Sequence, residues 1–184
     1  MICVLLANGY EEVEAISTID VLKRANLDVV TVAVEQHSDF LITGSHGITV
    51  KADVIIDDLD YVDKIDAVVL PGGMPGTLNL EASDKAREVI QYCADKNKVI
   101  AAICAAPSIL GHMGILAGRR ATCFPGFERE LKRAVFTGGS VTCDGNIITA
   151  DGAGSAIKFG EAIAAKFVGG EAARDISNAM QCRF

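Results

Sequence analysis

A cysteine stands where a buried strand is expected to turn into a helix, a position that suits a nucleophile. Cys104 follows the apolar run 99–103 and precedes Ala105, Ala106 and Pro107. A sharp strand-to-helix turn needs small residues beside the nucleophile, because bulky side chains would collide there. Amide groups at the start of the helix would also favour the thiolate form. The same pattern fits a small core residue before a proline-initiated helix equally well.

Three glutamates at the beginning of the first expected helix offer carboxyl groups to this chemistry. They are Glu11, Glu12 and Glu14. Acids at this end of a helix commonly stabilise it by opposing its dipole. Alternatively, one of them reaches the thiol, is kept protonated by burial, and forms a hydrogen bond with the thiolate.

A glycine pair, Gly72 and Gly73, follows the apolar run 67–70 after Pro71. It is either a tight turn or a loop whose free N–H groups face an oxyanion. The sequence contains no phosphate loop and no dinucleotide fingerprint, so no nucleotide cofactor is expected. The six cysteines form no C-x-x-C motif and the three histidines show no ligand spacing, so no metal site is expected either.

A parallel sheet would bring these three loops together. Short apolar runs alternate with amphipathic stretches, which predicts an α/β fold whose mostly parallel sheet is covered by helices on both faces. The expected strands are 2–6, 29–34, 67–70 and 99–103; the expected hairpins pair 41–42 with 48–50 and 141–143 with 147–149; the expected helices are 12–25, 83–96, 107–116 and one long helix after 155. Ligands bind beyond the carboxyl ends of such strands, so the loops meet in one crevice if their strands are neighbours.

The first expected helix carries apolar residues at intervals of three. They are Val13, Ile16, Ile19 and Leu22. This stripe is expected to be the apolar face of the helix. The residues near the start of the helix are candidates for a subunit interface as well as for the core.

Composition restricts the class of protein further. The chain has 184 residues, half of them apolar, which suits one domain over residues 1–184. A net charge of −7 without a cluster of Lys or Arg disfavours nucleic acid and anionic membranes as partners. The apolar run at the N-terminus is too short for a signal peptide or a membrane span, so we expect a cytoplasmic protein with free thiols.

Five motifs resemble the ThiJ/PfpI superfamily, in its branch of parkinsonism-associated protein deglycase relatives, and they follow the family's order along the whole chain. They are GYEEVEA at 9–15, DVLKRA at 20–25, VVLPGG at 68–73, AAICAAP at 101–107 and DGAGS at 151–155. The resemblance implies a flavodoxin-like three-layer sandwich with a mostly parallel sheet, class I glutamine amidotransferase-like, which is usually a homodimer.

The resemblance also implies roles for individual residues. Cys104 would be the nucleophile on a strained elbow, Glu14 the protonated carboxyl beside its sulfur, and the amides of Gly73 and Ala105 the oxyanion donors. Further candidates, as supporting residues or as residues supplied across a dimer interface, are Gly72, His46 and Arg24. The activities attributed to the family are glutathione-independent glyoxalase chemistry on methylglyoxal, protein deglycation, chaperone action and oxidative sensing through the cysteine.

The chain departs from the family pattern at several positions. Protease-like members carry His where this chain has Ala105, and an unassisted thiol is a poor amide hydrolase, so a protease is not expected. Phe124 matches a histidine near the thiol of human-like members. His46 matches an arginine that reaches across the dimer, and either substitutes for it or is a loop histidine. Asp151 and Ala153 stand where Arg or Gln and Pro are common.

We therefore expect a cysteine-dependent, stress-protective glyoxalase or deglycase. Its substrates would be small reactive carbonyl compounds such as methylglyoxal-like 2-oxoaldehydes, or glycated protein side chains. The alternative is a redox-sensing or chaperone-like protein that responds through oxidation of Cys104 and has no dedicated substrate. A homodimer is expected, with no cofactor, no nucleic acid and no membrane.

Overall fold

The fold is built around a seven-stranded sheet. A computed structural model describes residues 1–35, 40–59 and 62–183. The strand order is β10-β11-β7-β6-β1-β2-β5, in which β10 and β11 are antiparallel and every other neighbouring pair is parallel. The strands are β1 (Ile2–Leu6), β2 (Val29–Ala33), β5 (Val54–Ile55), β6 (Ala67–Leu70), β7 (Val99–Ile103), β10 (Val141–Asp144) and β11 (Ile147–Ala150). The mostly parallel sheet predicted from the sequence is confirmed.

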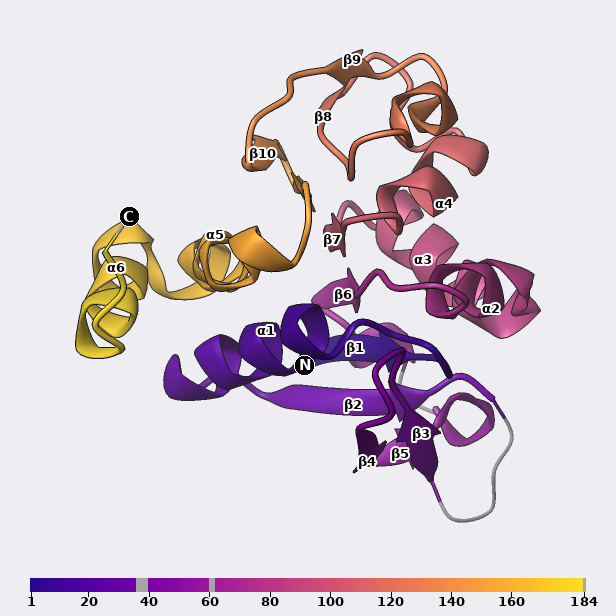
Figure 1. Cartoon of the computed structure of the whole chain (residues 1–184), viewed down its shortest axis with the longest axis horizontal. Coiled ribbons are helices and arrows are strands. Elements are labelled where there is room, and N and C mark those ends of the chain that lie inside the picture. Colours follow the sequence, from indigo (N-terminus) through magenta and orange to yellow (C-terminus); the bar gives the residue numbers. More distant parts are fainter. Residues whose placement is uncertain (36–39, 60–61, 184) are drawn as a thin grey trace.

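Helices cover both faces of this sheet, which gives a three-layer α/β sandwich (Figure 1). One face carries α1 (Glu12–Arg24) and α5 (Ala156–Val168), with α6 (Gly170–Ala179) packed on α5; the other carries α2 (Gly76–Ala82), α3 (Asp84–Asp95) and α4 (Pro107–His112). Two small sheets pair β3 (Leu41–Thr43) with β4 (Thr49–Lys51) and β8 (Arg120–Ala121) with β9 (Val135–Phe136). Short 3-10 helices are η1 (Ile56–Asp58), η2 (Val62–Lys64), η3 (Glu128–Leu131) and η4 (Ala153–Ser155).

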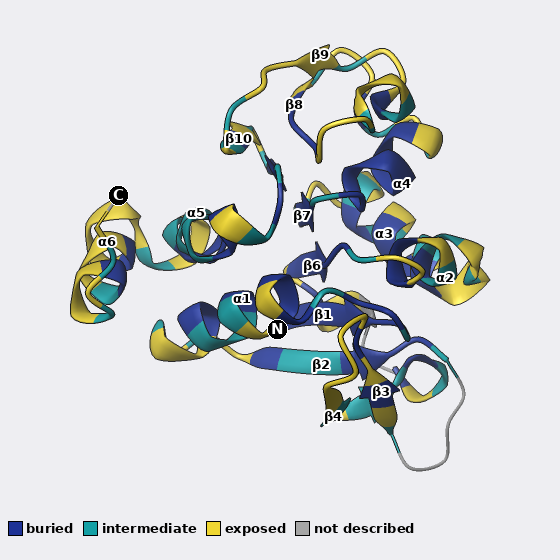
Figure 2. Ribbon diagram, viewed as in Figure 1, coloured by how far each residue is buried: buried dark blue, intermediate teal, exposed yellow. Residues whose placement is uncertain are grey.

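The core lies on both sides of the central strands, which are buried throughout (Figure 2). Along β1, Cys3 and Leu5 pack into the cluster on the α3 face, whereas Val4 and Leu6 pack into the cluster on the α1 face. Successive side chains of a strand point to opposite faces, so a strand covered on both sides must be apolar at every position. This is why uninterrupted apolar runs predicted the strands correctly.

The buried face of α1 is not the expected stripe. Val13 is 50% exposed and Ile16 is 42% exposed, whereas Leu22 is fully buried. A step of three residues falls about 60° short of a full helical turn, so the stripe winds around the helix and Val13 and Leu22 point in opposite directions. The buried positions of α1 are Glu12, Glu14, Ala15, Thr18, Val21 and Leu22.

Two expected helices also end earlier than predicted. The helix that begins at Pro107 stops at His112, because Gly114 turns into the left-handed region at φ +74°. The long last helix is broken into α5 and α6 by Gly169, at φ +85°. Among the described helices, none is long and apolar enough to cross a membrane.

Candidate active site

Cys104 lies at the carboxyl end of β7 in a backbone conformation that few residues adopt. Its φ is +64°, which costs an L-residue roughly 1–2 kcal/mol. Its N–H donates to the carbonyl of Ala150 at 2.9 Å, and its carbonyl accepts from the N–H of Phe124 at 2.8 Å. These bonds hold the strained turn in place, and the side chain remains partly exposed. The turn expected from the small neighbouring residues is present.

Gly72 brings the three loops into contact, because β7, β6 and β1 are neighbours in the sheet. The carbonyl of Gly72 accepts from the N–H of Glu11 at 2.9 Å. A Cβ atom on Gly72 would lie 2.6 Å from Cβ of Cys104 and 2.7 Å from Oε2 of Glu14. Any side chain here would therefore occupy the space in which the thiol and the carboxyl group meet.

Glu14 is the glutamate that reaches the thiol. It is 1% exposed; its Oε2 accepts from the N–H of Gly72 at 2.8 Å, and its side chain forms a hydrogen bond with Cys104. Burial raises the pKa of Glu14 to about 7, although the hydrogen bonds with Cys104 and Gly72 work in the opposite direction. A large fraction of Glu14 is therefore protonated at neutral pH, as a proton donor requires.

The thiol itself does not have the depressed pKa expected from its position. Burial, followed by the negative charge of Glu14, raises the pKa of Cys104 to about 12, while the amides of Ala105 and Gly73 act to lower it. The expected contribution of a helix dipole is small, because α4 has only six residues.

The two acids are in contact, so they titrate as a pair. The negative charge of Glu14 raises the pKa of Cys104, so the pair loses its first proton more easily than its second. After loss of one proton, the remaining proton is either on Cys104 or on Glu14. Cys104 is a thiolate in those molecules in which this proton is on Glu14. The donors expected for an oxyanion, the amides of Gly73 and Ala105, both approach the sulfur.

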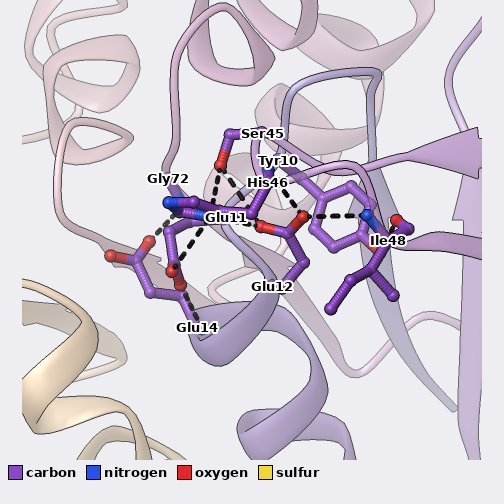
Figure 3. Close-up of polar contacts among 8 residues, drawn as sticks. All are labelled: Tyr10, Glu11, Glu12, Glu14, Ser45, His46, Ile48 and Gly72. Atoms are coloured by element: carbon purple, nitrogen blue, oxygen red, sulfur yellow. Dashed lines mark hydrogen bonds and ion pairs between the residues drawn. The ribbon is translucent and has the colours of Figure 1, made fainter.

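The carboxyl group of Glu12 forms hydrogen bonds with the β3–β4 hairpin (Figure 3). Its Oε1 accepts from the N–H groups of His46 at 2.7 Å and Ile48 at 3.3 Å, and its Oε2 lies 2.8 Å from Nδ1 of His46 and accepts from Oγ of Ser45 at 3.2 Å. Burial opposes the charge on Glu12, but the hydrogen bonds, chiefly those from His46, lower its pKa to about 2. This anchor was not predicted from the sequence. The signal was Gly44, where a Cβ atom would lie 2.4 Å from the carboxyl group.

Two expected site residues lie away from the thiol within this chain. His46 is exposed, and its hydrogen bond with Glu12 raises its pKa. Arg24 pairs with Asp20 at 2.8 Å between Nε and Oδ2. It lies near the opposite end of α1 from Glu14, about 15 Å along the helix axis. Neither side chain joins the cluster around Cys104, so any role in catalysis would require a second subunit.

A metal site was not expected from the sequence. In the described part of the chain, one group of side chains has the composition of a possible metal site. Ligand atoms of Glu11, Glu12 and His46 lie within 4.8 Å of one another. The carboxylate of Glu12 is already engaged by the hairpin. His37 lies outside the described residues. The absence of a metal remains a prediction.

A cavity of about 360 Å³ opens where β11 leads into η4. Its lining consists of Phe124, Pro125 and residues 151–155. Phe124 is 46% exposed, and its ring packs against the backbone of Gly152, where a Cβ atom would lie 3.3 Å from Cδ2. In the sequence, Phe124 and Asp151 stand out only as departures from a family pattern. Their meeting in one cavity depends on the tertiary structure.

Comparisons with known proteins agree on one family. A model of the DJ-1/PfpI family matches residues 1–166. Protein DJ-1 homolog B of Arabidopsis thaliana is 36% identical over 179 residues, and the match covers 97% of this chain but only 40% of that protein. A deglycase of Pyrococcus horikoshii is 34% identical over 148 residues, which cover 79% of this chain and 86% of that one. The structure of oxidized DJ-1 of Toxoplasma gondii superposes with a TM-score of 0.93 at 31% identity, covering 100% of this chain and 98% of that chain.

Proposed function

Because the chain belongs to the DJ-1/PfpI family, we propose that it is a cysteine-dependent, stress-protective glyoxalase or deglycase. Its substrates are methylglyoxal-like 2-oxoaldehydes or their early adducts with protein side chains. The observation that carries the proposal is the contact between the buried carboxyl group of Glu14 and the thiol of Cys104. This contact joins a nucleophile to a group that can both donate and accept a proton near pH 7.

The first step is addition of the thiolate to the aldehyde. The sulfur of Cys104 bonds to the aldehyde carbon, and the aldehyde oxygen takes the electron pair of its carbon–oxygen double bond. The amides of Gly73 and Ala105 donate to this oxyanion. Glu14 then gives it the shared proton, which leaves a hemithioacetal and a carboxylate.

The second step is a proton shift between neighbouring carbons. The carboxylate of Glu14 removes the proton from the sulfur-bearing carbon, and an enediolate forms. Glu14 returns this proton to the adjacent carbon, and the hydroxyl proton of the sulfur-bearing carbon passes to the neighbouring oxygen, which leaves a thioester next to an alcohol. One carbon is oxidised and its neighbour reduced, so the reaction needs no external oxidant or reductant. Water then hydrolyses the thioester to lactate and frees Cys104, and the overall change is the addition of one water to methylglyoxal.

An adduct on a side-chain nitrogen enters the same sequence by substitution. The sulfur of Cys104 bonds to the carbon that carries the nitrogen, the carbon–nitrogen bond breaks, and the thiol proton passes to the departing nitrogen. The side chain is released intact, and the hemithioacetal that forms is identical to the one made from free methylglyoxal.

Conversion of methylglyoxal to lactate tests the proposal directly. We expect Cys104→Ser to abolish turnover and Glu14→Gln to lower kcat by ~100-fold or more, as loss of a general acid–base group does. Cys143→Ser is the matched control, since Cys143 is exposed and lies outside the site. A Cys104→Ser or Glu14→Gln protein as active as the wild type would refute the proposal.

A redox-sensing or chaperone-like role is the second candidate. It is favoured by the partial exposure of Cys104 and by its hydrogen bond to Glu14, which could equally hold a sulfinate oxygen. Mass spectrometry after graded peroxide treatment should find Cys104 oxidised before the exposed Cys143. Equal oxidation of the two would count against this role.

We also propose that the chain forms a homodimer as a single cytoplasmic domain over residues 1–184. The exposed side chains of Val13 and Ile16 on α1 support the dimer, because large apolar side chains of this kind commonly mark an interface. A second copy would also be the source of any contribution from His46 or Arg24 to the site.

A further inference from the structure

One polar side chain lies inside the central strands of the sheet. Every residue of β1, β6 and β7 is hydrophobic, and so is every residue of β11 except Thr149. Thr149 is fully buried. Valine has a similar shape, suits a strand equally well and brings no hydroxyl group into the core. The hydroxyl group of Thr149 therefore has a reason other than formation of the strand.

The hydroxyl oxygen of Thr149 holds a neighbouring segment. It accepts from the N–H of Thr122 at 2.9 Å, and both residues are buried. Thr122 begins the segment 122–124, which directly follows β8. A buried N–H group needs a partner within the protein, because water does not reach it. This hydrogen bond therefore fixes the start of the 122–124 segment on β11.

The other end of the 122–124 segment contacts the reactive cysteine. The N–H of Phe124 donates to the carbonyl of Cys104 at 2.8 Å, and the N–H of Cys104 donates to the carbonyl of Ala150 at 2.9 Å. Ala150 thus holds one backbone group of Cys104 directly, and Thr149 holds the other through the segment. Two consecutive residues of β11 support the turn on which the thiol stands.

We infer that Thr149 is a positioning residue for Cys104: its hydroxyl group holds the 122–124 segment, which in turn supports the strained turn. Cys104 has a φ of +64°, and such a conformation persists only where the surrounding structure imposes it. An unpaired buried N–H is unfavourable by an amount similar to this strain. Loss of the acceptor on Thr149 would therefore allow the turn to relax and the sulfur to move away from Glu14.

The inference deepens the proposed function and rests on it, because it names a residue that acts on the rate through the position of the nucleophile. A displacement of about 1 Å can cost ~100-fold in rate, even when the substitution is far from the chemistry. We expect Thr149→Val to lower kcat for methylglyoxal by ~10-fold or more with little change in KM. Thr149→Ser, which keeps the hydroxyl oxygen, should restore kcat. Thr149→Cys, whose sulfur is a weak acceptor, should lie between them and provides the same test if Thr149→Val does not fold.

Thr31→Val is the matched control. Oγ1 of Thr31, on β2, accepts from the N–H of Asp53 at 2.9 Å, so the same kind of hydrogen bond is lost. In the sheet, β2 is a neighbour of neither β7 nor β11. This variant should keep the kcat of the wild type. A Thr149→Val protein with the kcat of the wild type, or an equal fall in kcat for Thr31→Val, would overturn the inference.

Hydrogen exchange reports on the turn without catalysis. We expect the amides of Phe124 and Cys104 to exchange about tenfold faster in Thr149→Val than in the wild type, because the segment opens locally. The amide of Val4 in β1 should exchange as it does in the Thr31→Val protein. Unchanged exchange at Phe124, or equal acceleration at Val4, would show that Thr149 has no specific effect on the turn.

Turnover and exchange separate this inference from the proposed function. If the wild type converts methylglyoxal to lactate but Thr149→Val changes neither kcat nor exchange at Phe124, the inference fails and the proposed function stands. If exchange at Phe124 and Cys104 becomes faster but the wild type does not convert methylglyoxal, the positioning role stands and the proposed function fails.

Discussion

The carboxyl group of Glu14 and the thiol of Cys104 meet across Gly72, in a space too small for a methyl group. A Cβ atom there would be 2.7 Å from Oε2 of Glu14 and 2.6 Å from Cβ of Cys104. The two residues lie 90 positions apart in the sequence (104 − 14). Glu14 lies in the first turn of α1, and Cys104 directly follows β7. The sheet order makes them one acid–base unit.

Gly72→Ala should therefore damage both stability and activity. The added methyl group would push apart Cys104 and Glu14 and would also meet the carbonyl of Ile103 at 2.9 Å. We expect a loss of about 1–3 kcal/mol in the free energy of unfolding, measured by chemical denaturation. Gly170→Ala, where a Cβ atom meets nothing within 4 Å, is the control and should be neutral or slightly stabilising. Equal stabilities of the two variants would contradict the packing described for Gly72.

Glu14 should make the free energy of unfolding fall as pH rises. Burial raises its pKa from 4.5 to about 7 in the folded protein, so the folded state binds this proton more tightly than the unfolded state does. The contribution is fully present below pH 4.5 and is lost as pH rises through 7, with a limit of about 3 kcal/mol. Denaturation from pH 5 to 8 should show the wild type losing stability relative to Glu14→Gln. Parallel curves for the two proteins would mean that Glu14 titrates normally.

Alkylation of Cys104 should report the shared proton. In the wild type the rate should rise in two stages, with the first near pH 7, because the pair loses its first proton there. In Glu14→Gln only the thiol can lose a proton, so we expect a single rise at a higher pH. The rates are measured with iodoacetamide and read by mass spectrometry at Cys104. Superimposable profiles would show that the two groups titrate independently.

Glu12→Gln should loosen the β3–β4 hairpin. The neutral amide would weaken the charge-assisted hydrogen bonds that now come from His46 and Ile48, at a cost of about 1–3 kcal/mol. Hydrogen exchange at these two amides should become faster. Because the pKa of Glu12 is lowered from 4.5 to about 2, this stabilisation is present above pH 4.5 and is lost as pH falls towards 2. Glu171→Gln, on the exposed start of α6, is the control; exchange rates equal to those of the control would refute the anchor.

Val13→Glu should separate the proposed dimer into monomers. A charge on this exposed apolar position of α1 would be buried without a partner in the interface, which is strongly unfavourable. Sedimentation velocity would measure the mass of each form. Val135→Glu is the matched control, because Val135 on β9 is 57% exposed and Val13 is 50% exposed. A wild type that sediments as a monomer, or a Val13→Glu protein that remains a dimer, would refute the proposal.

Much of the fold could be predicted from the sequence, because strands, caps and tight turns depend on residues that are close together in the chain. The continuous apolar runs that became β1, β6 and β7 reflect strands buried on both faces. The helix expected from residue 83 is present, and Oγ of Ser83 caps it by accepting from the N–H of Ala86 at 3.2 Å. Both expected hairpins are also present.

Helix faces and helix ends were less predictable. The apolar spacing on α1 suggested a face that includes Val13, yet the packing of α1 against α5 buries Val21 instead and leaves Val13 exposed. Spacing shows that a helix has an apolar side, but the neighbouring elements decide which side is covered.

By itself, the sequence determined the class of fold, the three loops at the strand ends and the turn on which Cys104 stands, because strand burial and turn geometry depend on neighbouring residues. The residue pattern left three glutamates open and only the family resemblance named Glu14; the tertiary structure separates them, since Glu11 caps α1, Glu12 anchors a hairpin and Glu14 accepts from the N–H of Gly72. It also decided that burial and the Glu14 charge raise the pKa of Cys104. Desolvation and charge–charge contact depend on residues that are distant in the chain, so they could not be predicted from neighbouring residues.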